Sequence, residues 1–400
     1  MNDAPLAEWL ETAASFSLPG PGVSRFFLTS EHRQLLDYLR PLMTACGLKT
    51  HLDHSGNLVG RRVSHASDKV LYIGSHQDTV PNGGSFDGML GILLALAAVC
   101  ELQDQKLPFT IEVVAFGDEE GVRFNSTLVG SKALSGTFDA SFLSDRDDQG
   151  ISLAEALLDF GLNPQKIPSI ARDPQNALGY IEVHIEQGPV LERENLPVGI
   201  VSAITGIERH AVSIQGQAGH AGTVPMHLRK DALVAASRYV QWVDANCKET
   251  KDMTGVVGHI EIRPNSVNVI PGDAYLTVEL CSPHKSVRRL ARKALGELTD
   301  GLAREGFAVD VRLVYSQEGV ICDDGLVRKL EAALRKEKVR PLSMYSGAGH
   351  DGLVMASLCP VAMLFVRCKD GLSHHPDEAI DMNDAIAAKE VLKRFIRDFM

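Results

Sequence analysis

The sequence lacks the cysteine pattern of a disulfide-stabilised or thiolate-bound metal protein. Its seven cysteines are scattered over 400 residues, are odd in number, and include no Cys-x-x-Cys pair. Disulfide frameworks and structural zinc knots are recognised by closely spaced or evenly paired cysteines. The cysteine content therefore favours a reducing compartment and indicates neither kind of cross-link.

Basic stretches and long apolar runs are also missing. Forty Lys and Arg residues stand against 51 Asp and Glu, a formal charge of −11, and no dense basic stripe of the kind that binds nucleic acid is present. No apolar run reaches the roughly 18 residues that span a membrane. The opening MNDAPLAEWLETAASF carries acidic residues where a signal peptide would be basic. We expect a cytoplasmic protein without nucleic-acid or membrane partners.

The first half of the chain alternates helical and strand-like segments. Residues 69–76 and 109–121 read as buried strands, and residues 88–102 read as an apolar helix that begins directly after Asp87. This alternation is typical of an α/β layer structure with a mainly parallel sheet. Ligands of such sheets bind at the carboxyl edge, where His76 and the acidic residues after the second strand are expected to lie.

A chain of 400 residues exceeds the usual size of a single core, so two domains are expected. From about Glu208 the order becomes strand, helix, two strands, helix and strand, which resembles a ferredoxin-like α+β sandwich. After about Ile321 the α/β alternation resumes. We therefore predict a catalytic domain made of residues 1–207 and 322–400, with residues 208–321 inserted as a second domain.

Five patches combine imidazole and carboxylate side chains with turn residues. They are GSHQDTV (74–80), GGSFDG (83–88), GDEEG (117–121), HIEQG (184–188) and GLSHHPDE (371–378). Taken alone, each reads as an ordinary polar loop, but the acids of GDEEG follow an apolar strand, where buried charge is costly without compensation. Histidine and carboxylate ligands without cysteine suit zinc or manganese. Together the patches predict a site for two divalent metal ions, identity open.

The order of these motifs resembles the amidase, hydantoinase and carbamoylase family. That family includes N-carbamoyl-L-amino acid hydrolase, β-ureidopropionase of the dinuclear type and allantoate amidohydrolase, within the aminoacylase and carboxypeptidase clan. The resemblance runs from about residue 20 to about 380 and is most specific in HIEQGPVLE (184–192) and AGHAGTVPM (218–226). It implies a zinc-peptidase-like catalytic domain, a lid or dimerisation role for the insert, a homodimer, and hydrolysis of a linear amide in a small N-carbamoyl substrate.

The resemblance also implies a set of metal ligands. It assigns His76 and His184 to different ions, makes Asp87 the bridging carboxylate, and adds Glu120 and His374 as further ligands. His374 is chosen over His375 because the family's ligand directly follows the serine, here Ser373. Asp78 is expected to be the carboxylate that orients the imidazole of His76, as ligating histidines commonly require.

The remaining roles concern catalysis and substrate binding. Glu119 would be the general base that takes a proton from water and returns it to the leaving nitrogen. His220, from the inserted domain, would stabilise the oxyanion that develops on the substrate carbonyl. Further contacts to the substrate are expected from the side chains or backbone of Gln187, Asn268, Gly347 and Gly349.

One departure from the family concerns the substrate's tail. The family continues after NVIPG to an Asp-x-Arg whose arginine holds a carboxylate, whereas this chain has Glu279-Leu280-Cys281. A thiol cannot form that bidentate pair, so either another arginine (Arg229, Arg288 or Arg289) replaces it or the substrate lacks the carboxylate. Two other functions stay open: an aminoacylase or dipeptidase, and a non-catalytic small-molecule binding protein.

Overall fold

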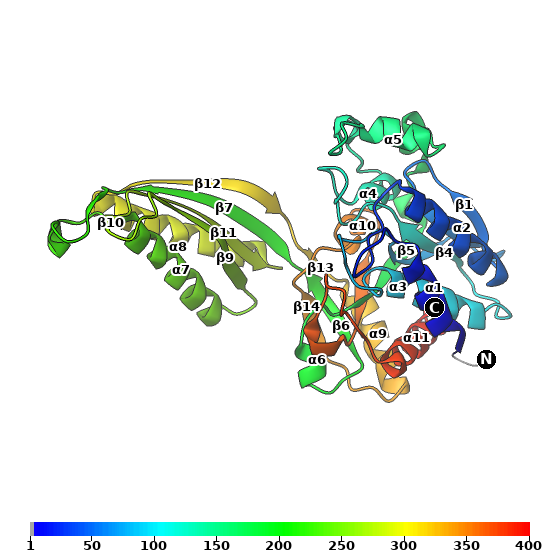
Figure 1. Cartoon of the computed structure of the whole chain (residues 1–400). Coiled ribbons are helices and arrows are strands. Elements are labelled where there is room, and N and C mark those ends of the chain that lie inside the picture. Colours follow the sequence, from blue (N-terminus) through cyan, green and yellow to red (C-terminus); the bar gives the residue numbers. More distant parts are fainter. Residues whose placement is uncertain (1–3) are drawn as a thin grey trace. The chain divides into compact units, whose positions relative to one another are not determined.

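A computed structural model describes residues 4–400, in which the chain forms two units (Figure 1). Unit 1 contains the residues up to Ala203 together with Cys322–Met400, and unit 2 is Ile204–Ile321. Unit 1 is thus built from both ends of the chain, with unit 2 inserted between them.

Unit 1 is organised around a mixed β-sheet with the strand order β1-β2-β4-β3-β5-β15-β6, and β14 also pairs with β6. The central strands β4, β3, β5 and β15 are parallel. Every residue of β3 and β4 is buried, as expected for parallel strands covered on both faces. The strands are β1 (Lys49–Leu52), β2 (Leu58–Arg62), β3 (Val70–His76), β4 (Thr110–Phe116), β5 (Ala177–Ile185), β6 (Val198–Ile204), β14 (Ser343–Ser346) and β15 (Val361–Val366).

Helices pack on this sheet, and the most apolar of them, α3, contacts β3, β5, α1 and α11. Ten of its residues are buried because it is apolar all round. The α-helices of the unit are α1 (Ala4–Ser15), α2 (Ser30–Ala45), α3 (Met89–Glu101), α4 (Val129–Ser135), α5 (Leu153–Asp159), α6 (Val190–Arg193), α9 (Asp324–Lys336), α10 (Gly352–Met355) and α11 (Met382–Arg397). Within residues 4–400, no helix combines the length and apolar character needed to cross a membrane.

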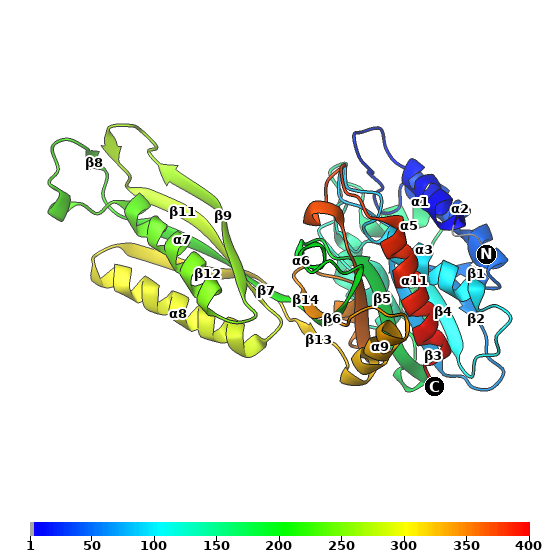
Figure 2. The ribbon, with the colours of Figure 1, turned by 90° about the horizontal axis from the view of Figure 1, so that it is seen from below.

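Unit 2 is a four-stranded antiparallel sheet with the order β12-β7-β11-β9, on which two helices pack (Figure 2). Its elements are β7 (Gly206–Gln215), α7 (Ala232–Glu249), β9 (Thr254–Arg263), β11 (Asp273–Ser282), α8 (Lys285–Arg304) and β12 (Ala308–Gln317). Alternate residues of β11, among them Leu276 and Leu280, join the core shared with α7 and α8. Short strands β8 (Gly219–His220) and β10 (Val269–Ile270) pair with each other, and β13 (Val320–Ile321) ends the unit.

This architecture confirms the predicted fold class of a mainly parallel α/β layer structure with a ferredoxin-like antiparallel insert. The feature of this fold that matters for function is that strands β3, β4 and β5 end side by side. His76 is the last residue of β3 and pairs in register with Phe116, the last residue of β4, while His184 lies one residue before the end of β5. Parallel neighbours end at the same edge, so side chains far apart in sequence meet there.

Candidate metal centre

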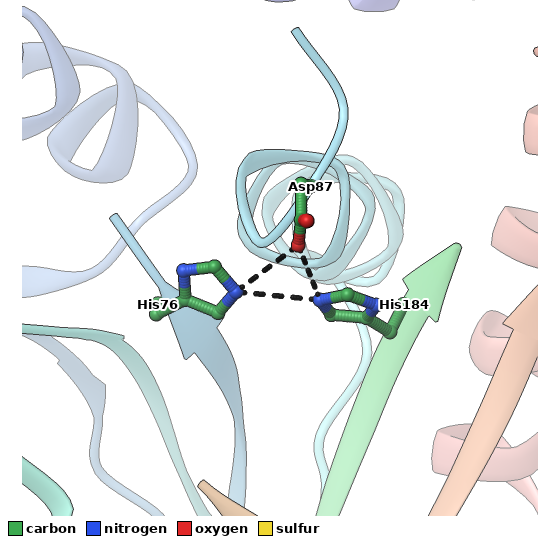
Figure 3. A group of neighbouring side chains, drawn as sticks. All are labelled: His76, Asp87 and His184. Carbon is green, nitrogen blue, oxygen red and sulfur yellow. Dashed lines mark hydrogen bonds and ion pairs between the residues drawn. The ribbon is translucent and has the colours of Figure 1, made fainter. Parts of the chain in front are cut away.

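Two histidines and one aspartate form a buried triangle at this edge of the sheet (Figure 3). The Nε2 atom of His184 lies 2.9 Å from Asp87 Oδ1, and the Nε2 atom of His76 lies 3.3 Å from the same oxygen. The two Nε2 atoms are themselves 3.3 Å apart. Three ligand atoms thus face one point from β3, β5 and the start of α3.

Glycines let the start of α3 approach the two strands closely enough for Asp87 to reach the histidines. Gly88 has φ +64°, and a Cβ at this position would lie 2.5 Å from the ring of His76. A Cβ at Gly91 would lie 2.0 Å from the carbonyl oxygen of Val183. Any side chain at these positions would push the helix away, so the triangle depends on both glycines.

A second group of ligand atoms shares Asp87 with the first. His374 Nε2 lies 3.2 Å from Asp87 Oδ2 and 3.6 Å from Glu120 Oε1. Glu119 and Glu120 also come within reach of His76 as a third possible group. Asp87 therefore turns one oxygen to each of the first two groups, as a carboxylate between two ions would.

The opposite ring nitrogens of the two buried histidines contact backbone carbonyls. His76 Nδ1 lies 3.0 Å from the carbonyl oxygen of Asp78, and His184 Nδ1 lies 3.0 Å from that of Ile185. An Nδ1–H group that donates to a carbonyl leaves the Nε2 lone pair free for a cation. In that tautomer both imidazoles would present Nε2 to a cation beside Asp87.

The carboxylate of Asp78 has a different partner from the one expected. It accepts hydrogen bonds from the backbone amides of Glu119 and Glu120, each at 3.1 Å. The expectation that this carboxylate orients His76 is corrected, because the carbonyl oxygen of Asp78 does so instead. The side chain holds the acidic turn that follows β4.

Charge in the cluster is strongly perturbed. Burial raises the pKa of the Glu119 carboxyl well above its usual value and raises that of Glu120 to about 7. Burial opposes charge on Asp87 too, but the neighbouring His184, His374 and His76 hold its pKa well below the usual range. Several buried acids thus compete for few positive charges, an imbalance that bound cations would relieve.

The spacing of the donor atoms fits divalent ions. Ligands at about 2.0 to 2.2 Å from a common ion in tetrahedral geometry lie roughly 3.3 Å from one another. The contacts within the first two groups range from 2.9 to 3.6 Å. His76 and His184 share one group with Asp87, and Glu120 and His374 share another, so the grouping favours a common ion for the two histidines over the separate ions that the resemblance implied.

Gln187 and Gly349, two other expected site residues of unit 1, lie beside these groups. Gln187, with φ +56°, places Nε2 3.0 Å from Asp87 Oδ2 and 3.4 Å from His374 Nε2. A Cβ at Gly349 would lie 3.8 Å from Glu119 Oε1, whereas Gly347 faces open space. His375 instead accepts a hydrogen bond from the amide of Asp377, so His374 is the histidine of this loop that faces Asp87.

His220 and Asn268 lie in unit 2, outside the groups of ligand atoms in unit 1. Both are exposed, and they are held together because the amide of Ala221 donates to the carbonyl of Asn268 at 2.9 Å. The Nδ1 atom of His220 accepts a hydrogen bond from the amide of Gly222 at 3.0 Å. The opposite ring nitrogen of His220 takes no part in that contact.

The three arginines considered as replacements for the missing anchor differ in their surroundings. Arg288 is buried and donates to the carbonyl of Ser282 and to Glu318, and Arg229 donates to carbonyls of its own loop. Arg289 is exposed. The guanidinium of Arg288 is therefore already used by contacts within unit 2.

Sequence reasoning missed Arg209. On β7 it stands opposite Glu279 of β11 and donates two hydrogen bonds to that carboxylate, at 2.8 and 2.6 Å. Cys281 Sγ lies 3.9 Å from the other oxygen of Glu279. The register of the two strands places Arg209 opposite Glu279, and no sequence signal indicates that register.

Sequence reasoning also missed Ser373 and Glu378 as site residues, although both belong to GLSHHPDE. Ser373 Oγ lies 3.1 Å from Asp87 Oδ2 and 3.0 Å from Glu378 Oε2. The carboxylate of Glu378 also accepts the backbone amides of Phe86 and Asp87. The motif itself was recognised as part of the site. Its two histidines were considered as metal ligands, and its serine and glutamate were not given a role.

Comparisons with known proteins agree with this chemistry. Residues 72–398 match the model of Peptidase family M20/M25/M40. The chain is 38% identical to an N-carbamoyl-L-amino acid amidohydrolase of Geobacillus stearothermophilus, over 94% of this chain and 92% of the relative. It is 35% identical to an allantoate deiminase of Arabidopsis thaliana, over 94% and 79%. A crystal structure of an amidase of the hydantoinase/carbamoylase family from Burkholderia multivorans aligns with TM-score 0.91 and 31% identity, covering 99% of this chain and 97% of the other.

Proposed function

The chain belongs to Peptidase family M20/M25/M40 and to its hydantoinase/carbamoylase amidases, and from this premise we propose that it hydrolyses an N-carbamoyl compound with two divalent ions. It is an amidohydrolase of the carbamoylase and allantoate amidohydrolase type. The observation that carries the proposal is Asp87, whose two oxygens face two separate groups of ligand atoms. The non-catalytic alternative is not retained.

The proposed ligands are divided between the two ions. His76 and His184 would hold one ion, Glu120 and His374 would hold the other, and Asp87, which belongs to both groups, would be shared between them. When bound, the two ions supply Lewis acidity that acidifies a water molecule and polarises the scissile carbonyl. Zinc and manganese both suit this donor set.

Glu119 is the proposed general base. Its neighbour Glu120 turns to His374, and the Asp78 carboxylate fixes the backbone of both acids. Glu119 accepts a proton from the attacking water as the oxygen bonds to the carbonyl carbon. It then delivers that proton to the nitrogen as the C–N bond breaks, so it ends in its starting state.

Substrate contacts are proposed for the residues around the cluster and for two residues of unit 2. Gln187 and the backbone amides of Gly347 and Gly349 would hydrogen-bond polar groups of the substrate. His220 would donate to the carbonyl oxygen as negative charge develops on it, with Asn268 as a second polar contact. Truncating His220 should lower kcat by roughly the 100- to 1000-fold that is typical of one oxyanion donor.

The tail of the substrate is proposed to differ from that of an ordinary N-carbamoyl amino acid. Cys281 stands where the family's arginine would be, and the nearby Arg209 is already paired with Glu279. We expect Cys281→Arg to lower KM for N-carbamoyl-L-amino acids and Cys281→Ser to leave it unchanged. Efficient and equal turnover by the wild type and Cys281→Arg would contradict the altered specificity.

An aminoacylase or dipeptidase activity is the second candidate, since the matching family model is one of peptidases. The same attack by water would cleave an acyl or a carbamoyl carbon, and the ligand set does not separate them. Release of ammonia does, because a cleaved carbamoyl group ends as ammonia and carbon dioxide whereas a cleaved acyl group ends as a carboxylic acid.

The test is a substrate screen with restored metal. Protein stripped by chelation is supplied with zinc or manganese and offered carbamoyl, formyl and acyl amino compounds, with allantoate included. Free amine and ammonia are measured for the wild type and for Glu119→Gln. Absence of turnover on every ureido compound with either ion would refute the proposed function.

Assembly as a homodimer through unit 2 is also proposed. The sheet of unit 2 has two edge strands, β12 and β9, and exposed apolar side chains such as Val256, Ile260 and Val314. Edge strands and exposed apolar side chains are features that a second copy would cover. Light scattering coupled to size exclusion tests this, and a monomer at micromolar concentration would exclude it.

A further inference from the structure

Glu378 connects two distant segments of unit 1 through one buried carboxylate. Its side chain is 5% exposed. Oε1 accepts the backbone amides of Phe86 at 2.9 Å and Asp87 at 3.0 Å, and Oε2 accepts the hydroxyl of Ser373 at 3.0 Å. Glu378 thus contacts the backbone of Asp87, which both ligand groups share, and the side chain of Ser373, which directly precedes His374.

The loop before α3 is shaped to receive this carboxylate. A Cβ at Gly84 would lie 2.1 Å from the carboxyl carbon of Glu378. The backbone therefore packs directly against the carboxylate, and only glycine leaves the space. Burying a charged group in this way costs stability, and the contacts with the two amides and the hydroxyl offset part of that cost.

A loop closed by backbone hydrogen bonds joins Glu378 to His374. The amide of Lys369 donates to the carbonyl of Ala379 at 2.8 Å, and the amide of Glu378 donates to that of His375 at 3.1 Å, so the loop is closed at its base. His374 has φ +54° within this loop. A residue with a side chain holds this conformation when its surroundings determine it, and the closed loop is such a surrounding.

The hydroxyl of Ser373 completes the connection. Its oxygen lies between two carboxylates, 3.1 Å from Asp87 Oδ2 and 3.0 Å from Glu378 Oε2, and it has only one hydrogen to donate. Gln187 Nε2 donates to the same oxygen at 3.2 Å. An ion held by Asp87 Oδ2 would leave the hydroxyl hydrogen to Glu378, so the carboxylate can keep Ser373 and His374 in place in both states.

We infer that Glu378 is a positioning residue that fixes Asp87 and His374 relative to each other and thereby preforms the Asp87, Glu120 and His374 ion site. The inference rests on the proposed two-ion function. The group formed by His76, Asp87 and His184 depends less on Glu378, because both of its histidines are fixed by strands β3 and β5. Loss of Glu378 should therefore weaken the binding of one ion much more than the binding of the other.

The experiment titrates the chelated full-length protein with Zn²⁺ and, separately, with Mn²⁺ by calorimetry. We expect the wild type to bind two equivalents of metal. In Glu378→Ala the affinity for the second equivalent should fall by about 10- to 100-fold, the usual effect of removing a hydrogen-bond partner of a metal ligand. Glu378→Gln keeps a carbonyl for the two amides and should recover most of the affinity. Ser373→Ala, which leaves the amide contacts intact, should weaken the same equivalent less.

Glu155→Ala is the control for removing a hydrogen-bonded carboxylate outside the ligand groups. Glu155 accepts the backbone amide and the hydroxyl of Ser152 at 2.8 and 2.6 Å, a similar pattern at the start of α5, away from the ligand groups. It should bind both equivalents like the wild type. At stoichiometric metal, Glu378→Ala should lose kcat with KM unchanged, and excess metal should restore kcat.

Two results would overturn the inference. One is unchanged affinity for both equivalents in Glu378→Ala and Ser373→Ala. The other is equal weakening of both equivalents with a lowered melting temperature of the metal-free protein, which marks a purely structural role. A wild type that binds neither ion would refute the proposed function itself, so the two failures are distinguishable.

Discussion

The Nε2 atoms of His76 and His184 lie 3.3 Å apart and share Asp87 Oδ1 as a neighbour. Both rings are buried, and both use Nδ1 against a backbone carbonyl. Two imidazoles held in this way present two lone pairs to the same small space. We therefore expect both histidines to bind the same ion in the proposed centre, which has direct consequences for metal content.

Metal content of histidine variants tests this pairing. His76→Ala and His184→Ala should each remove the same equivalent, and the double variant should still bind one ion at Asp87, Glu120 and His374. Asp87→Ala should lose both equivalents, because this residue belongs to both groups. Elemental analysis after dialysis gives the stoichiometry. A double variant that binds no ion would indicate that the two histidines bind different ions.

Glu119 and Glu120 are adjacent, but substitutions of the two residues should have different effects. Glu119→Gln should lower kcat by roughly 100- to 10,000-fold, the range for a positioned acid or base, while both ions remain bound. Glu120→Gln should instead lose one equivalent of metal, because Glu120 Oε1 belongs to the group with His374. Parallel measurement of kcat and metal content separates them, and metal loss in Glu119→Gln would contradict its role as base.

Asp78 should act through the backbone of the two acids. Asp78→Ala removes the acceptor of the Glu119 and Glu120 amides, and we expect about a 10- to 100-fold loss of kcat/KM, as for other partners of metal-site residues. Binding of the ion at His76 should persist, since that ring is held by the carbonyl oxygen of residue 78. A selective loss of the ion at His76 would show that the carboxylate orients the ring after all.

His32 predicts how stability changes with pH. Burial lowers the pKa of His32 to about 3, and its Nδ1 accepts the amide of Leu28 at 3.0 Å. Below the unfolded pKa of about 6.5 the unfolded chain binds a proton that the native state does not, so stability falls with falling pH, by about 2 kcal/mol at pH 5.

The comparison is between His32→Asn, which keeps an acceptor near the amide of Leu28, and His65→Asn at an exposed position. Urea unfolding at about pH 7.5, 6 and 5 should show a flatter pH dependence for His32→Asn than for the wild type. His65→Asn should retain the wild-type slope. Identical slopes for all three proteins would remove His32 from the acid response.

Much of this protein follows from its sequence because the signals are local. The apolar runs that end at His76 and before Glu119, and the apolar helix directly after Asp87, predict the α/β class and the edge at which the site forms. The mixture of histidines and carboxylates without cysteine predicts the kind of ion. Each of these inferences needs only neighbouring residues and the rule that parallel strands end together.

The partners of each side chain required the tertiary structure. His76 and His184 are 108 residues apart and meet because β3 and β5 are neighbours in the sheet, an order that chain distance does not encode. The turn of the Asp78 carboxylate toward the acidic loop, and the reach of Glu378 across 291 residues to the amide of Asp87, likewise depend on packing. Sequence periodicity determines which residues are buried at an edge, whereas the strand order and the loop conformations decide which of them touch.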